Sequence, residues 1–186
     1  GYKVSGGLHG VGASVVNALS EWLVVQVHKN GQIYEMKFSR GEITQPMRVV
    51  GTTDKTGTVV TFKPDPDMFD VTTYSYDIIH TRMQQQAFLN AGLQISTYDR
   101  REGRDEADSM RYEGGIREYV TWLNANKTPV HEDVIYMAGQ KDDSSVEVAL
   151  QYNDSYSETI VSFANDVRTP EGGMHEEGFK RALTTA

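Results

Sequence analysis

The 186-residue sequence contains no cysteine, no long apolar run and no surplus of positive charge. Without cysteine, a disulfide framework and a thiolate metal site are both excluded, which is compatible with the cytoplasm. No run approaches the roughly 18 apolar residues that indicate a membrane span, and no secretory signal opens the chain. Eighteen Lys and Arg against 26 Asp and Glu give a net charge of −8, which argues against DNA wrapping by this stretch alone.

The chain also lacks an initiating methionine, since it begins with Gly1 and Tyr2. It stops at Ala186, within a pattern typical of a helix. We therefore expect both ends to be cuts within a longer protein. The length and a hydrophobic content of 38% suit one sizeable domain or two small ones.

The first half of the chain alternates between helical and strand-like patterns. Apolar residues at helical spacing predict a helix over 13–23, and a second, long helix starts at Thr72 or Thr73 and runs to about Asn90. Asn30-Gly31, a pair that tolerates positive φ, predicts a hairpin between strands over 23–27 and 33–38. A further strand is expected over 57–62, and the proline-rich acidic turn after it cannot extend that strand.

The second half contains more short strand-like segments. A strand over 93–98 is followed by a charged run over 100–108, which we interpret as a solvated hairpin tip without a function. The pattern resets near residue 111, which indicates a second domain. It holds a helix over 116–126 and strands over 134–137, 146–152 and 159–163. Helices on one side of strand-rich layers, twice over, predict an α+β fold.

A cluster of glycines directly precedes the first predicted helix, at residues 6–12, GGLHGVG. Glycine lets backbone amides approach an anion closely, and the amides at a helix start are unpaired, so phosphate is the natural occupant. The spacing fits neither a Walker loop, which needs Gly-Lys-Ser/Thr, nor the Rossmann Gly-x-Gly-x-x-Gly. A flexible linker or a tight helix entry would account equally well for the glycines alone.

The neighbouring residues carry a specific resemblance. Residues 2–20, YKVSGGLHGVGASVVNALS, resemble the second glycine box of gyrase-type ATPases in the GHKL superfamily. Residues 55–62, KTGTVVTF, resemble the third box at the family's distance. The motifs YEGGI (112–116), KTP (127–129), VEVALQYND (146–154) and EGGMHEEGF (171–179) resemble the transducer domain of these proteins. The resemblance covers the whole chain, with small departures at Asn165-Asp166 and Met174, which we expect to tune the transducer surface.

This resemblance implies a domain organisation. Residues 1–110 would form the C-terminal part of a GHKL (Bergerat) ATPase sandwich. Residues 111–186 would form the N-terminal part of a ribosomal-protein-like β-α transducer. Val4 and the motif at 112–115 are nearer to the gyrase branch than to topoisomerase IV, which stays the alternative. A chaperone or mismatch-repair ATPase of the superfamily is a more distant one, and a binding module without catalysis is a third.

The resemblance also implies the nucleotide-binding residues. Backbone amides from Leu8 to Gly12 would hold the β- and γ-phosphates of ATP, each charge-assisted bond contributing ~1.5 to 3 kcal/mol. Thr58, on sequence alone an ordinary packing residue, would line the adenine pocket through its hydroxyl. His9 is expected to offer its main chain rather than a proton. The full set is Tyr2, Lys3, Leu8, His9, Gly10, Val11, Gly12, Ala13, Thr58 and Val60.

The family's catalytic groups are not among these residues. Its general-base glutamate and Mg²⁺-binding asparagine belong to a helix upstream of Gly1, and its γ-phosphate lysine follows Ala186, so we expect no ATPase activity from this stretch alone. The parent protein would use ATP and Mg²⁺ and would dimerise through its ATPase domain. It would act on DNA together with the gyrase A protein. His28, His80 and His131 lack metal-site spacing and are interpreted as surface or edge residues, and His175 as the start of a helix.

Overall fold

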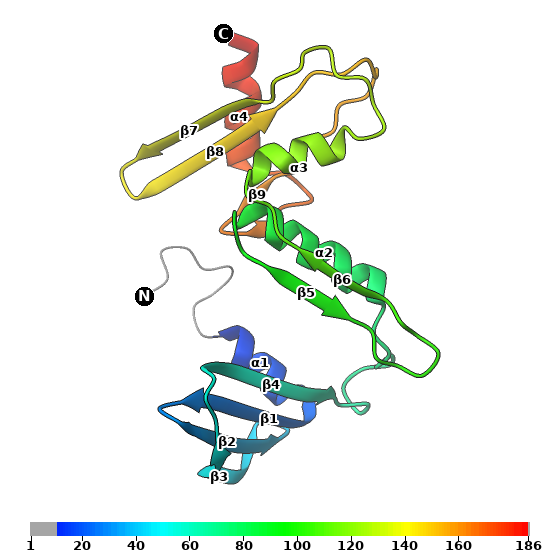
Figure 1. Cartoon of the computed structure of the whole chain (residues 1–186). Coiled ribbons are helices and arrows are strands. Elements are labelled where there is room, and N and C mark those ends of the chain that lie inside the picture. Colours follow the sequence, from blue (N-terminus) through cyan, green and yellow to red (C-terminus); the bar gives the residue numbers. More distant parts are fainter. Residues whose placement is uncertain (1–10, 186) are drawn as a thin grey trace. The chain divides into compact units, whose positions relative to one another are not determined.

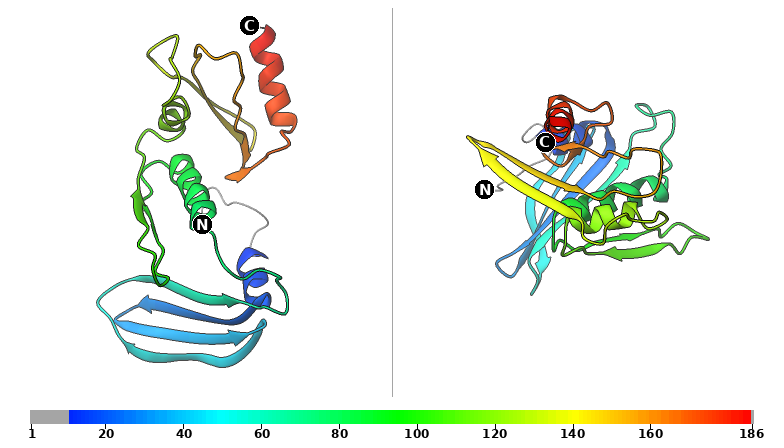
Figure 2. Two further views of the ribbon diagram at one scale, coloured as in Figure 1. Left: turned by 90° about the vertical axis from the view of Figure 1, so that its right-hand side faces the viewer. Right: turned by 90° about the horizontal axis from the view of Figure 1, so that it is seen from above.

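The computed structural model describes residues 11–185, which form two compact units that divide between Thr73 and Tyr74. The first unit holds one helix and a four-stranded antiparallel sheet in the order β3-β2-β1-β4 (Figures 1 and 2). Its elements are α1 (Val11–Ala18), β1 (Ser20–Lys29), β2 (Gln32–Ser39), β3 (Glu42–Thr52) and β4 (Gly57–Pro64).

The hairpin predicted at Asn30-Gly31 is confirmed. These residues have φ values of 53° and 77°, and β1 and β2 pair on either side of them. A second tight turn at Arg40-Gly41, with φ values of 50° and 87°, leads into β3. β3 was not predicted from the sequence.

An ion pair closes the first unit where the chain leaves β4. The Arg40 guanidinium lies 2.6 Å (Nε to Oδ2) from Asp65, a residue that is almost fully buried. The backbone N–H of Asp67 also donates to Asp65, and this bond together with Arg40 lowers the pKa of the carboxyl. This ion pair joins the β2–β3 turn to the turn after β4, and the Arg40 N–H also donates to Ser20 O at the start of β1.

The second unit holds three helices and three separate two-stranded antiparallel sheets between Tyr74 and Thr185. β5 pairs with β6, β7 with β8, and β9 with β10. The elements are α2 (Tyr76–Leu89), β5 (Ile95–Tyr98), β6 (Ala107–Met110), α3 (Ile116–Leu123), β7 (Ile135–Lys141), β8 (Ser144–Leu150), β9 (Phe163–Ala164), β10 (Val167–Arg168) and α4 (Met174–Thr185).

Several predicted boundaries are wrong although the elements exist. The first helix ends at Ala18, because the chain turns there and already pairs as β1 from Ser20. The long helix begins at Tyr76, where Ser75 Oγ accepts a hydrogen bond from the Ile78 N–H and so caps it in place of Thr72 or Thr73. The strand expected over 159–163 is reduced to the two residues of β9.

The core of the second unit is aromatic. Phe88 of α2 is 1% exposed and stacks on Tyr112 and on Tyr119 of α3. Ala87 and Met110 are also buried there. Side chains of α2 and α3 therefore meet in this core.

Candidate nucleotide-binding site

The first turn of α1 contains three of the predicted nucleotide-binding residues, Val11 and Gly12 for the phosphates and Ala13 for the apolar wall. Backbone N–H groups in a first turn have no partner within their own helix and lie at the positive end of its dipole. Among the residues that the structure describes, no heavy atom lies within 4 Å of a Cβ built on Gly12. Tyr2, Lys3, Leu8, His9 and Gly10 lie outside the residues that the structure describes.

Thr58 and Val60 lie two residues apart on β4, so their side chains point to the same face of the sheet. Their partners on β1 are Val27 and Val25, which are half-buried on that face. Val60 is 51% exposed and Thr58 is also exposed. The structure therefore gathers an open apolar wall with one hydroxyl, as a flat heteroaromatic ring requires.

The helix start and the wall belong to the same unit. α1 packs against β1, and Ser20 Oγ donates to Val16 O at 2.6 Å. β1 in turn pairs with β4 along its length. The other end of α1 lies beside the β2–β3 turn, since a Cβ built on Gly41 would be in van der Waals contact with Ala18 Cα, at 3.5 Å.

His28 supports the loop that precedes Thr58, although the sequence placed it among surface or edge residues. It is half-buried, and its Nδ1 lies 3.2 Å from Thr53 Oγ1. Thr53 Oγ1 also accepts from the Lys55 N–H at 3.1 Å. The imidazole therefore holds the turn from which β4 starts, opposite Gly57 in the β1–β4 register.

His80 and His131, which the sequence also placed among surface or edge residues, have structural partners too. His80 Nε2 lies 2.7 Å from Asp108 Oδ2, and this bond is the largest cause of the lowered pKa of Asp108. The Tyr152 N–H donates to His131 Nε2 at 3.0 Å. Between residues 11 and 185, no three His, Asp or Glu side chains are grouped as a metal site would require.

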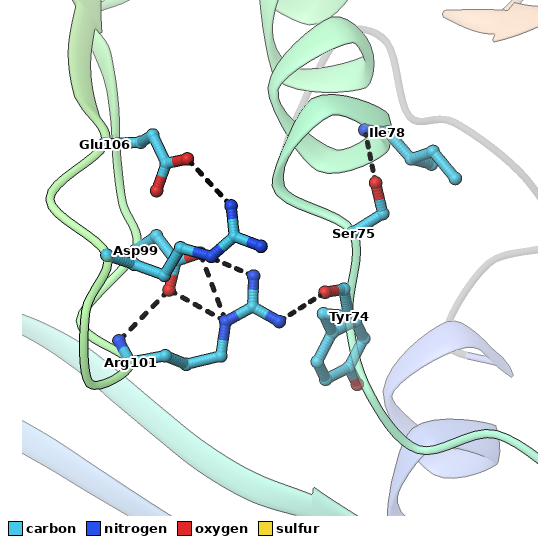
Figure 3. A network of polar contacts seen from close by, with 7 residues as sticks. Tyr74, Ser75, Ile78, Asp99, Arg101 and Glu106 are labelled. Atoms are coloured by element: carbon cyan, nitrogen blue, oxygen red, sulfur yellow. Dashed lines mark hydrogen bonds and ion pairs between the residues drawn. The ribbon is translucent and has the colours of Figure 1, made fainter.

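A charged network at the β5–β6 turn was missed by the sequence interpretation of residues 100–108. Arg101 donates through Nε to Asp99 Oδ1 at 2.9 Å and through Nη1 to Tyr74 O at 2.7 Å (Figure 3). Arg101 lowers the pKa of Asp99 to about 2. An aspartate two residues before an arginine at a turn is the signal that the sequence offers. The sequence gives no sign of the bond to Tyr74 O, because Tyr74 lies 27 residues away.

Comparison with solved structures agrees with this fold. The crystal structure of the 43K ATPase domain of Thermus thermophilus gyrase B, in complex with an aminocoumarin, matches with a TM-score of 0.83. The two share 39% identity, over 94% of this chain and 48% of that one. The gyrase B protein from Myxococcus xanthus matches with a TM-score of 0.79 at 25% identity, over 89% and 48% of the two chains.

Curated sequences give the same result. The DNA gyrase B protein of Streptococcus pneumoniae is 53% identical over 185 residues, which are 99% of this chain and 28% of the relative. The Staphylococcus epidermidis protein of the same name is 52% identical over 99% of this chain. The family model for DNA gyrase B matches residues 115–186. Over nearly its whole length, the chain is similar to DNA gyrase B proteins.

The gyrase B resemblance and the α+β GHKL-type fold predicted from the sequence are thereby confirmed. The chain spans less than a third of the length of the curated gyrase B relatives it matches. No helix in the described part of the chain is long and apolar enough to cross a membrane.

Proposed function

We propose that this chain is part of the ATP-binding component of a bacterial type II topoisomerase, namely the gyrase B protein of DNA gyrase. The observation that carries the proposal is the 53% identity over 99% of the chain to the gyrase B protein of Streptococcus pneumoniae. The helix start and the open β4 wall in one unit support it, since they suit the two ends of a nucleotide.

In this proposal the backbone amides from Leu8 to Gly12 bind the β- and γ-phosphates of ATP, and Ala13 and Val60 form apolar wall. Thr58 offers its hydroxyl to the adenine, and Tyr2 and Lys3 contact the nucleotide from the lid side. Mg²⁺ would accompany the phosphates, held by an asparagine that the resemblance assigns to residues outside this sequence. Amides dominate because several charge-assisted bonds outweigh one side chain.

The proposed domain organisation is the one that the sequence resemblance implies. Residues 1–110 belong to the ATPase domain and residues 111–186 to the transducer, where the gyrase B family model also matches. ATP binding would dimerise the ATPase domains around a DNA segment in the cytoplasm. With the gyrase A protein, ATP use would then drive strand passage and negative supercoiling.

The test is ATP titration into the complete gyrase B protein that carries this chain, with Thr58→Val as the informative variant. The substitution keeps the shape and removes the hydroxyl, so ATP affinity should fall roughly threefold to tenfold. Thr61→Val is the matched control, because Thr61 lies on the same strand, is exposed and points to the opposite face. Absence of saturable ATP binding by the unsubstituted protein would contradict the proposal.

A second measurement separates gyrase from topoisomerase IV. Reconstituted with the gyrase A protein, the complete gyrase B protein should introduce negative supercoils into relaxed plasmid when ATP and Mg²⁺ are present. Decatenation without negative supercoiling would assign the chain to topoisomerase IV instead.

A further inference from the structure

The connection between β3 and β4, residues 53–56, crosses the end of the sheet from one edge to the other. β3 and β4 are the outer strands of the described sheet, whose order is β3-β2-β1-β4 (Figure 1). Neighbouring strands lie ~4.8 Å apart, so three intervals separate β3 from β4 by ~14 Å. The five peptide units from Thr52 to Gly57 span at most ~18 Å when they are fully extended. The connection therefore has little slack, and a contact that holds it also determines where β4 begins.

Thr53 attaches this connection to the β1–β2 hairpin at two points. Its N–H donates to Gly31 O in the hairpin turn at 3.0 Å. Its Oγ1 lies 3.2 Å from His28 Nδ1 and also accepts from the Lys55 N–H at 3.1 Å. The backbone and the side chain of Thr53 thus tie the crossing segment to both ends of the tip of the hairpin.

His28 holds Thr53 from the face of the sheet that lies away from the proposed adenine wall. In the β1–β4 pairing, His28 is opposite Gly57, and Val27 is opposite Thr58. Successive side chains of a strand point to opposite faces, so the imidazole and the Thr58 hydroxyl lie on different sides of the sheet. His28 can therefore influence a nucleotide at Thr58 only through the backbone.

The imidazole has no second bond with which to replace the contact to Thr53. Its Nε2 atom is buried and has no hydrogen-bond partner among residues 11–185. Loss of the Nδ1 contact would therefore release the side chain of Thr53 from β1.

The first residues of β4 have few other restraints. All residues of β4 are exposed except Pro64, which is half-buried. Within the described part of the chain, β4 pairs with β1 alone. Thr58 is the second residue of β4, so a displacement of the connection reaches it almost directly.

We propose that His28 is a positioning residue of the nucleotide site, which holds Thr53 and thereby fixes the start of β4 and the Thr58 hydroxyl. This inference rests on the proposed function, in which that hydroxyl meets the adenine. A hydrogen bond weakens steeply when its distance and angle depart from the ideal, so a small shift of β4 is enough to lower its strength. The imidazole thus contributes to ATP affinity without contacting ATP, and its contribution cannot exceed that of the Thr58 hydroxyl.

ATP titration into the complete gyrase B protein that carries His28→Leu tests the inference. Leucine occupies similar space and removes the contact with Thr53. ATP affinity should fall about threefold, and no further than in Thr58→Val. In a protein that already carries Thr58→Val, His28→Leu should lower ATP affinity no further, because the hydroxyl that it positions is gone.

Two further variants separate positioning from general stabilisation. His28→Asn places a polar side-chain atom where Nδ1 lies and should restore ATP affinity. Thr53→Val removes the same contact from its other partner and should reproduce the fall, so it decides the matter if His28→Leu does not fold. Thr52→Val is the matched control, because it makes the same exchange at the exposed neighbouring residue and should leave ATP affinity unchanged.

The possible outcomes are distinct. Folded His28→Leu and Thr53→Val proteins that keep the unsubstituted ATP affinity overturn the inference. An equal fall in affinity with and without the Thr58 hydroxyl also overturns it, because His28 would then not act through Thr58. An unsubstituted protein without saturable ATP binding overturns the proposed function instead.

Discussion

At the scale of single residues, substitution of Gly12 can separate an effect on ATP binding from an effect on the stability of the fold. Its position in a helix and the open space around it mean that Gly12→Ala should not strain the fold. Alanine should instead raise stability by about 0.5 to 1 kcal/mol, because glycine is the weaker helix former. If phosphate approaches this backbone, the added methyl group should weaken ATP binding by about tenfold or more, which thermal unfolding and ATP titration of the complete protein would measure.

Gly31→Ala is expected to show the opposite pattern. Gly31 has a φ of +77° in the β1–β2 turn, where a Cβ costs about 1 kcal/mol or more. The variant should lower stability and leave ATP affinity unchanged. If Gly12→Ala left ATP affinity intact but destabilised the protein, the assignment of the α1 start to phosphate would be wrong.

The sequence predicts those parts of the candidate site that depend on neighbouring residues in the chain. Glycines before a helix point to an anion, and alternation along 57–62 places Thr58 and Val60 on one face. The role of His28 could not be predicted from the sequence, because its partner Thr53 lies 25 residues away, just after β3, and reaches it only once the strands of the sheet have paired.

At the scale of elements, strands and helices were predicted where one face alternates cleanly. β3 was missed because Pro46 interrupts it and its pairing with β2 shifts register, so its side chains do not alternate regularly. As an edge strand it tolerates the proline. In α2 the apolar Ile78 is 67% exposed, whereas the polar Gln85 is buried together with Phe88. Glutamines can lie inside because the partners of Gln84 and Gln85 are tyrosine hydroxyls at least 28 residues away.

The β5–β6 turn makes a pH-dependent contribution that can be measured. Asp99 has a folded pKa of about 2, below the ordinary 3.8, because Arg101 donates hydrogen bonds to it. A lowered carboxyl pKa stabilises the fold above the ordinary value, so the contribution is complete above about pH 4 and is lost as the pH falls towards 2. Arg101→Lys should reduce this loss of stability between pH 4 and 2, because an ammonium cannot reach both Asp99 and Tyr74 O as the guanidinium fork does.

Arg100→Lys provides the control for this prediction. Arg100 is the exposed neighbour and lies over the Tyr98 ring rather than against Asp99. Its substitution should leave the pH profile as it was. Carboxyl NMR should show Asp99 titrating near pH 2 in the unsubstituted protein, and a value near 3.8 would show that the network does not form in solution.

At the scale of the whole molecule, the sequence pattern and the packing of the structure place the division of the chain at different residues. The sequence pattern resets near residue 111, and the family model begins to match at residue 115. Contacts group α2, β5 and β6 with the later elements, from Tyr74 onward. The stack around Phe88 supplies the physical reason, because it joins residues on both sides of position 111. A sequence pattern cannot reveal this, since aromatic residues are common in both segments.

The division of catalytic groups gives the last prediction. The proposed site, within residues 2–60, offers mainly backbone amides, an apolar wall and one hydroxyl, which are groups suited to binding a nucleotide but not to activating water. Hydrolysis needs a general base and a bound Mg²⁺, and the resemblance assigns both to residues outside this sequence. A polypeptide of these 186 residues should therefore show no ATP hydrolysis above background, whereas the complete gyrase B protein should hydrolyse ATP in the presence of magnesium. The measurement is phosphate release from both at equal concentration. Magnesium-dependent turnover by the shorter polypeptide that survives repeated purification would place a general base among its own residues, and the assignment would have to be redrawn.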